Sequence, residues 1–224
     1  MTLPMTDSES LRQRVLLATL PNVTFDGWSL QAMAAGAQSA GVPAAQLPLL
    51  FPGGIADLIE RFSAWADAEM VRHLEQHDIA LLKAREKVAL AIRLRLEALQ
   101  PHREAVRLGA AFLALPQNAA LALKLTHRTV DAAWYAAGDR SVDFNYYTKR
   151  LLLGGVATAT LLYWLSDRSE GHADSWAFLE RRIADVMRLG EAAAKGASAR
   201  GLSALLQNLP SPGRFARHFR RPAG

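Results

Sequence analysis

Residues Val130–Arg150, V-D-A-A-W-Y-A-A-G-D-R-S-V-D-F-N-Y-Y-T-K-R, join the two most apolar helical segments of the chain. Gly138 is expected just past a helix end, where a left-handed backbone costs glycine little. Asp143 is expected to cap the next helix, because its carboxylate can accept the free N–H groups of the first turn. The stretch therefore predicts a helical corner between helices at about residues 119–137 and 143–166.

The aromatic residues of this corner allow two interpretations. They are core residues if the neighbouring acids only cap helices. Counting back from Trp134 in helical steps, however, gives Asp131, Val130 and His127, which is a mixed stripe rather than an apolar one. An aromatic residue beside an acid on a half-polar helix face is typical of a protein-binding patch. Both interpretations stay open at this point.

The rest of the chain is predicted to be all-α, because apolar spacings of three and four recur and alternating patterns are rare. The first helix is expected at about residues 11–20, ending before Pro21. Ser29 is expected to cap the second helix and Gly41 to end it, with a short element after Pro43. The later helices are expected at about residues 55–78, 83–100, 104–115, 119–137, 143–166 and 174–189.

The composition excludes several classes of site. The chain has 224 residues and no cysteine, so disulfides, thiolate nucleophiles and cysteine metal ligands are absent. Leu151–Leu165 is the most apolar run, but a bilayer span needs about 20 such residues. This run is apolar on nearly every face and contains Gly154 and Gly155, so it predicts a buried helix. Such a thin helix serves either tight packing or a cavity for an acyl or isoprenoid chain.

The first sixty residues resemble the helix-turn-helix unit of tetracycline-repressor (TetR) regulators, but they lack the chemistry for DNA. Binding to phosphates needs basic side chains, and residues 21–60 contain no Lys or Arg. The candidate recognition helix, A-A-Q-L-P-L-L-F, contains Pro48, and only Gln46 could contact base edges. We therefore expect no nucleic-acid partner.

No catalytic or metal site is expected. His73 and His77 are four residues apart, but the glutamate is displaced from the position of a zinc-protease motif and no third ligand is evident. Asp139 and Asp143 are better explained as turn and capping residues than as acid–base catalysts. The prediction is a protein that is not an enzyme and has no cofactor.

The net charge of +5 is concentrated in the tail, because residues 195–224 contain basic residues and no acid. Apolar side chains on one face and arginines on the other suit a helix in an anionic membrane interface. The alternative is packing on its own domain or on a dimer partner. The candidate membrane-binding residues are Leu202, Leu205, Leu206, Leu209, Arg214, Phe215, Arg217 and Phe219.

Several motifs in order resemble the lipid-binding family of coenzyme Q biosynthesis, the ninth protein of the eukaryotic set and its bacterial relatives. They are D-G-W-S at Asp26–Ser29, A-x-G-A-Q-S-x-G at Ala34–Gly41, the corner at Asp131–Arg150 and W-x-F-L-E-R-R at Trp176–Arg182. The similarity covers about residues 11–195. It implies a TetR-like helical bundle with a C-terminal amphipathic helix, homodimers, and a bound lipid.

The resemblance also implies a role: a non-catalytic accessory protein that presents isoprenoid quinone intermediates at the membrane to the di-iron demethoxyubiquinone hydroxylase. The ligand is expected to be such an intermediate or a phospholipid. The implied partner patch is Asp131, Trp134 and Tyr135. Alanines at 132, 133 and 136 depart from the larger or polar groups of animal members. The candidate lipid-contact residues are Leu125, Leu152, Val156, Leu161 and Met187.

The expected organisation has three parts: a helix-turn-helix-like unit at 1–54, a lipid-binding and dimerisation core at 55–195, and a membrane-binding tail at 196–224. The first ten residues have no pattern of a signal or transit peptide. We therefore expect a bacterial cytoplasmic protein peripheral to the inner membrane, or a processed protein on the matrix side of the mitochondrial inner membrane. The alternative function is a ligand-responsive TetR-type transcription regulator.

Overall fold

The computed structural model describes residues 7–138 and 144–194, and these residues form helices without any strand. The chain divides into two compact units, Met1–Ser141 and Val142–Gly224. The predicted all-α class is confirmed. The predicted functional boundaries after residues 54 and 195 stay predictions. The membrane-binding tail at 196–224 lies outside the described residues.

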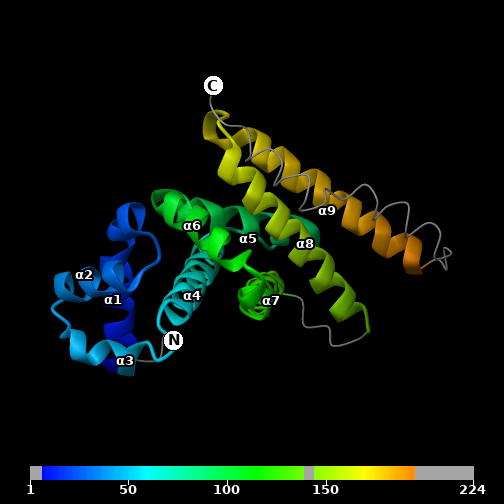
Figure 1. The fold of residues 1–224 in the computed structure, drawn as a ribbon. Coiled ribbons are helices and arrows are strands. Elements are labelled where there is room, and N and C mark those ends of the chain that lie inside the picture. The colour runs from blue at the N-terminus through cyan, green and yellow to red at the C-terminus, as the bar shows by residue number, and fades with distance from the viewer. Residues whose placement is uncertain (1–6, 139–143, 195–224) are drawn as a thin grey trace. The chain divides into compact units, whose positions relative to one another are not determined.

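The described residues of the first unit form seven α-helices and short 3-10 turns. α1, α2 and α3 gather at one end of this unit, and α4, α5, α6 and α7 form its other part (Figure 1). Within it, α4 packs against both α5 and α7. The bounds are α1 Asp7–Asp26, α2 Leu30–Ser39, α3 Leu47–Leu50, α4 Ile55–Leu74, α5 Ala84–Leu99, α6 Arg103–Leu113 and α7 Ala119–Ala136.

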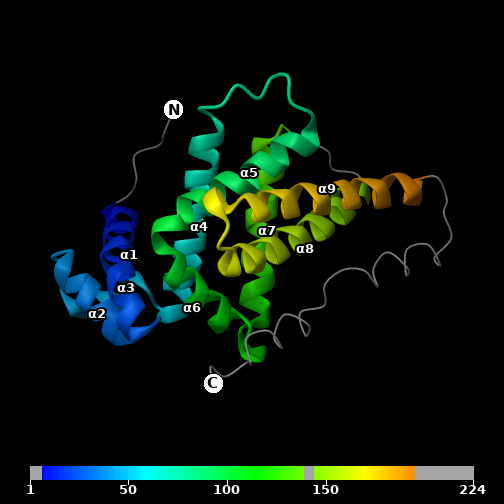
Figure 2. The ribbon, with the colours of Figure 1, turned by 90° about the horizontal axis from the view of Figure 1, so that it is seen from above.

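The second unit is a pair of long helices, α8 at Phe144–Ser166 and α9 at Ala173–Ala194. They run side by side in both views (Figures 1 and 2). The rings of Tyr163 and Phe178 stack between them at a centroid distance of 4.7 Å. Trp164 and Leu179 are buried in this unit, at 0% and 2% exposure. One side of the apolar run is buried, but Leu151 is 77% exposed, so the predicted burial on nearly every face is not found.

The contact between α1 and α2 depends on one glycine. A Cβ atom added at Gly36 would lie 2.1 Å from Thr19 Oγ1 and 2.7 Å from the Thr19 backbone, so no larger residue fits. Thr19 is fully buried, and its hydroxyl donates to the Val15 carbonyl at 2.7 Å. The predicted cap of α2 is confirmed, since the Ser29 hydroxyl accepts from the Ala32 N–H at 3.1 Å.

The predicted end of the first helix before Pro21 is wrong, because α1 continues through Pro21 to Asp26. Proline removes the N–H that would reach the Leu17 carbonyl. Both Pro21 and Leu17 are exposed, so water can satisfy that carbonyl. Leu20 and Val23 on the opposite side are buried, and their packing against the core outweighs the lost hydrogen bond.

The predicted extension of the fourth helix to residue 78 is also wrong, because α4 ends at Leu74. Arg72 and His73 lie in its last turn, where positive charge is favoured. His77 therefore lies beyond the helix, and its Nδ1 is 2.9 Å from the His73 carbonyl oxygen. The two histidines do not share a helix face. In the described part of the chain, no group of three His, Cys, Asp or Glu side chains could hold a metal.

A buried polar network joins the three helices α4, α5 and α7. Asp67 of α4 accepts hydrogen bonds from Arg95 Nε at 2.7 Å and from the Thr129 hydroxyl at 2.8 Å. Arg95 also donates to Ser63 at 3.1 Å. Because each of these groups would be costly to bury alone, the network fixes how α7 sits on α4.

Candidate functional site

The helix α7 positions the predicted partner patch. Its C-terminus is fixed by Gly138 at φ +87°, which confirms the predicted left-handed residue at the helix end. The Gly138 N–H donates to the Tyr135 carbonyl at 3.0 Å. Val130 and Ala133 are buried. Asp143, the predicted cap of the next helix, lies outside the described residues.

The three predicted patch residues differ in exposure. Tyr135 is 71% exposed, Asp131 is partly exposed, and Trp134 is only 7% exposed. Asp131 and Tyr135 are four residues apart and therefore lie on the same face of α7. The accessible part of the patch is thus a tyrosine beside a carboxylate, whereas the tryptophan is almost fully buried. The partner role of all three stays a prediction.

The exposed face of α7 continues from this patch toward the helix N-terminus. Leu123 at its far end is also 71% exposed. Lys124, His127 and Arg128 are exposed between the two ends. The outer face of α7 is therefore basic in its middle and has a large exposed side chain at each end.

The predicted lipid-contact residues occupy both compact units. Leu125 is buried at 6% exposure in the first unit. In the second unit, Val156 is buried at 3%, while Leu152 and Leu161 are partly exposed. The Met187 side chain lies outside the described part of the structure. Their convergence on one lipid stays a prediction.

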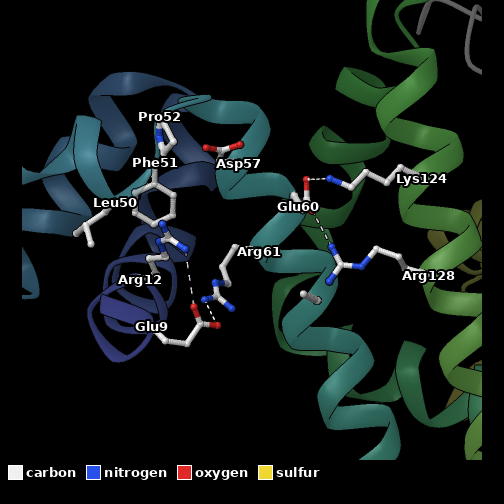
Figure 3. A pocket seen from close by; sticks show the side chains of 11 residues that line it. Glu9, Arg12, Leu50, Phe51, Pro52, Asp57, Glu60, Arg61, Lys124 and Arg128 are labelled. Atoms are coloured by element: carbon white, nitrogen blue, oxygen red, sulfur yellow. Dashed lines mark hydrogen bonds and ion pairs between the residues drawn. The ribbon is translucent and has the colours of Figure 1, made fainter. Parts of the chain in front are cut away.

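A groove in the first unit was not predicted. It has a volume of about 400 Å³ and lies among α1, α4, α7 and the segment after α3 (Figure 3). Its α7 side includes Lys124 and Arg128, whose spacing of four residues already indicates a shared face. Nothing in the sequence pairs them with Glu60, which is more than sixty residues away. The lining residues are Glu9, Arg12, Leu50, Phe51, Pro52, Asp57, Glu60, Arg61, Ala64, Lys124 and Arg128.

Among the described helices, none is by itself both long and apolar enough to cross a membrane; a sharply bent pair, Ala84–Leu113 with Pro116–Ala136, passes the same test jointly.

Comparisons with known proteins place this chain in a family. The model of the COQ9 family matches residues 119–190. "Ubiquinone biosynthesis protein COQ9-B, mitochondrial" of Xenopus laevis is 35% identical over 197 residues, which are 85% of this chain and 67% of the relative. The chain belongs to the COQ9 family. The COQ9 proteins of Homo sapiens and Drosophila melanogaster, also named as mitochondrial ubiquinone biosynthesis proteins, are each 35% identical, over 83% and 81% of this chain.

The COQ9 family model matches the last three described helices, α7, α8 and α9. The family model begins at the first residue of α7 and ends within α9. It therefore includes the patch at Asp131, Trp134 and Tyr135. The chain spans 60% of the length of the human relative and 56% of the Drosophila relative.

A solved structure shows the same fold as this COQ9 family member. The crystal structure of the TetR transcriptional regulator from Nitrosomonas europaea ATCC 19718 aligns with a TM-score of 0.65. The alignment covers 80% of this chain and 98% of the regulator, at 21% sequence identity. At that identity the likeness shows the fold alone. The predicted TetR-like fold is confirmed.

Proposed function

We propose that this COQ9 family member is a non-catalytic accessory protein of ubiquinone biosynthesis. It binds an isoprenoid quinone intermediate or phospholipid at the membrane surface and presents the quinone to the demethoxyubiquinone hydroxylase. It acts as a homodimer, with the tail at 196–224 in contact with the membrane, on the cytoplasmic face of a bacterial inner membrane or the matrix face of the mitochondrial one. The names of its relatives support the pathway.

The observation that best supports the partner surface is the exposure of Tyr135 beside Asp131. An exposed tyrosine supplies a large contact area at a small cost in side-chain entropy, and such residues are frequent anchors at interfaces. The buried network below α7 holds this helix rigidly on α4, so the surface is preorganised for binding.

The lipid role is supported by the composition of α8. Its apolar run leaves few polar groups along the helix, and Gly154 and Gly155 remove side-chain volume from it. The driving force for lipid uptake is the burial of isoprenoid surface, at about 25 cal/mol per Å² before the costs of association. Organic extraction of the purified protein followed by mass spectrometry tests this. Isoprenoid quinones or their precursors are the expected lipids. An empty protein from cells that make ubiquinone contradicts a carrier role.

The partner surface is tested by measuring the affinity for the hydroxylase from the same organism. Tyr135→Ala is expected to weaken the complex at least tenfold, because it removes the exposed anchor. Leu123→Ala is the matched control, since Leu123 lies on the same helix with the same 71% exposure. Equal affinities of the wild-type protein and the Tyr135→Ala variant would rule out the assigned surface.

Trp134→Ala tests the buried member of the patch. It is also expected to weaken the complex, because loss of this buried side chain alters the helix end that presents Tyr135. Its loss creates a cavity that costs about 3–5 kcal/mol of stability, so the thermal midpoint must be measured alongside. Unchanged affinity in a folded Trp134→Ala variant would remove this residue from the patch.

The second candidate function is a ligand-responsive regulator, which the TetR-like fold favours. The residues of the helix-turn-helix-like unit argue against DNA binding. The helix at the recognition position, α3, has only four residues, and Pro48 is one of them. Residues 21–60 contain no Lys or Arg and so offer no basic side chain to phosphates. A gel-shift titration against duplex DNA at 50 and 200 mM salt separates the two, since a regulator must show salt-sensitive binding.

A further inference from the structure

The groove of the first unit has more positive groups than carboxylates free to neutralise them. Its lining contains the cations Arg12, Arg61, Lys124 and Arg128 and the acids Glu9, Asp57 and Glu60. On the α1 side, Arg12 and Arg61 share the single carboxylate of Glu9 (Figure 3).

The α7 side repeats this arrangement. Lys124 Nζ and Arg128 Nη1 both contact the carboxylate of Glu60, at 2.8 and 2.7 Å. The third acid, Asp57, accepts a hydrogen bond from the Gly53 N–H at 2.6 Å and forms no ion pair with these cations among the described contacts. Each side of the groove therefore has two cations on one carboxylate, and with Asp57 included the lining has one positive charge in excess.

Arg12 is the cation whose hydrogen-bonding capacity is least used. Its Nη1 is 3.9 Å from Glu9, which is too long for a hydrogen bond. Its Nε atom is buried and has no hydrogen-bond partner within the described part of the chain. The Arg12 side chain as a whole is 36% exposed, so its outer guanidinium nitrogens can donate to an oxygen acceptor that enters the groove.

We propose that this groove binds a phosphate group, either free or as a phosphate monoester. Arg12 is the principal donor, and Arg128 contributes from the α7 side. The excess positive charge of the lining favours an anion, and the guanidinium fork suits the oxygen atoms of a phosphate group. A volume of about 400 Å³ lies in the range of small-molecule sites.

The bound phosphate would lie next to the proposed partner surface. Arg128 is three residues before Asp131 and seven before Tyr135, so the three lie along one face of α7. A ligand here would also link α1, α4 and α7 and so stabilise the first unit. Because Glu9 and Glu60 oppose an anion and the groove is open to solvent, the affinity is expected to be modest and to fall with added salt.

The direct test is calorimetric titration of the full chain with inorganic phosphate and with glycerol 3-phosphate at constant ionic strength. Saturable binding is expected. Arg12→Gln and Arg128→Gln should each weaken it at least tenfold, with circular dichroism confirming the fold. Arg72→Gln is the matched control, because Arg72 is an exposed arginine of α4 paired with Glu69 outside the groove. No saturable binding of either ligand or of the vesicles below, or an equal loss in Arg72→Gln, overturns the proposal.

Glu60→Gln provides a test in which phosphate binding should strengthen rather than weaken. Removal of this carboxylate frees Lys124 and Arg128 and lowers the repulsion, so phosphate binding should tighten several-fold. If these ion pairs only stabilise the fold, Glu60→Gln should not increase the affinity for phosphate. Weaker binding in a folded Glu60→Gln variant overturns the proposed role of the α7 side.

A second arm identifies the source of the phosphate. Vesicles of phosphatidylcholine with and without phosphatidic acid are sedimented with the wild-type protein and with the two groove variants. Loss of the phosphatidic-acid-dependent fraction in both variants assigns a lipid headgroup. Binding of soluble phosphate with unchanged vesicle sedimentation assigns a free small molecule.

Discussion

The Thr129 hydroxyl of α7 donates a hydrogen bond to the Asp67 carboxylate of α4 at 2.8 Å, across 62 residues of sequence. Both residues are buried, at 7% and 9% exposure. The same carboxylate oxygen accepts from Arg95 Nε at 2.7 Å. This arrangement holds α7, and with it the exposed Tyr135, at a fixed rotation on the first unit.

Asp67→Ala is expected to destabilise the protein by about 3–5 kcal/mol, because it leaves the Arg95 guanidinium buried without its carboxylate. Thr129→Val should cost only about 1–3 kcal/mol, since it removes one hydrogen bond and keeps the shape of the side chain. Urea unfolding measures both. Equal costs for the two variants would show that Arg95 finds another partner.

Gly36→Ala is expected to destabilise the protein by about 1–3 kcal/mol. The added methyl group would overlap the Thr19 side chain and backbone, so α1 and α2 must move apart. Gly155→Ala is the control, because a Cβ atom there meets nothing within 4 Å. The thermal midpoints of both variants check this, and a Gly36→Ala variant as stable as the wild type would show that the helices separate without cost.

Asp167 makes stability depend on pH below about 4. Burial acts to raise the pKa of this carboxyl, but hydrogen bonds from the Ser175 and Ser169 hydroxyls and N–H groups outweigh it and lower the pKa to about 2. A lowered pKa stabilises the folded state above the unfolded pKa of about 3.8, and this contribution is lost as the pH falls toward 2.

The corresponding measurement is urea unfolding of the wild type and Asp167→Asn between pH 6 and pH 2.5. The difference in unfolding free energy should be constant above pH 5 and shrink below pH 4. Asp174→Asn, at an exposed acid in the first turn of α9, serves as the control. A difference that stays constant down to pH 2.5 would contradict the lowered pKa.

Pro21→Ala is expected to stabilise the protein by about 1 kcal/mol. Alanine restores the N–H that can reach the Leu17 carbonyl, and it is the better residue inside a helix. The gain is smaller than the full penalty of proline, because proline also restricts the unfolded chain. Thermal unfolding checks the sign, and a lower midpoint would mean that the proline fits α1 without strain.

Much of the fold could be predicted from local sequence. Ser29 as a cap, and Gly41 and Gly138 as helix-ending residues with positive φ, were all predicted correctly. The spacing of apolar residues also predicted the positions of most helices. These features depend on backbone conformation and on neighbours within one or two turns, so the sequence contains them directly.

Two helix ends were wrongly predicted. Local rules end a helix before Pro21 and allow α4 to continue to residue 78. In the structure, burial of Leu20 and Val23 extends α1, and α4 ends at Leu74. Burial against distant residues outweighed the local preference in the first case.

The sequence by itself determined the all-α class, the Ser29 cap of α2 and the glycines that follow the ends of α2 and α7. Only the tertiary structure decided that Tyr135 is exposed while Trp134 is buried, because exposure depends on which faces of α7 pack against other helices. It alone also brought Glu60 to Lys124 and Arg128. Periodicity identifies a helix and its candidate faces, whereas an ion pair between helices requires the packing that only folding creates.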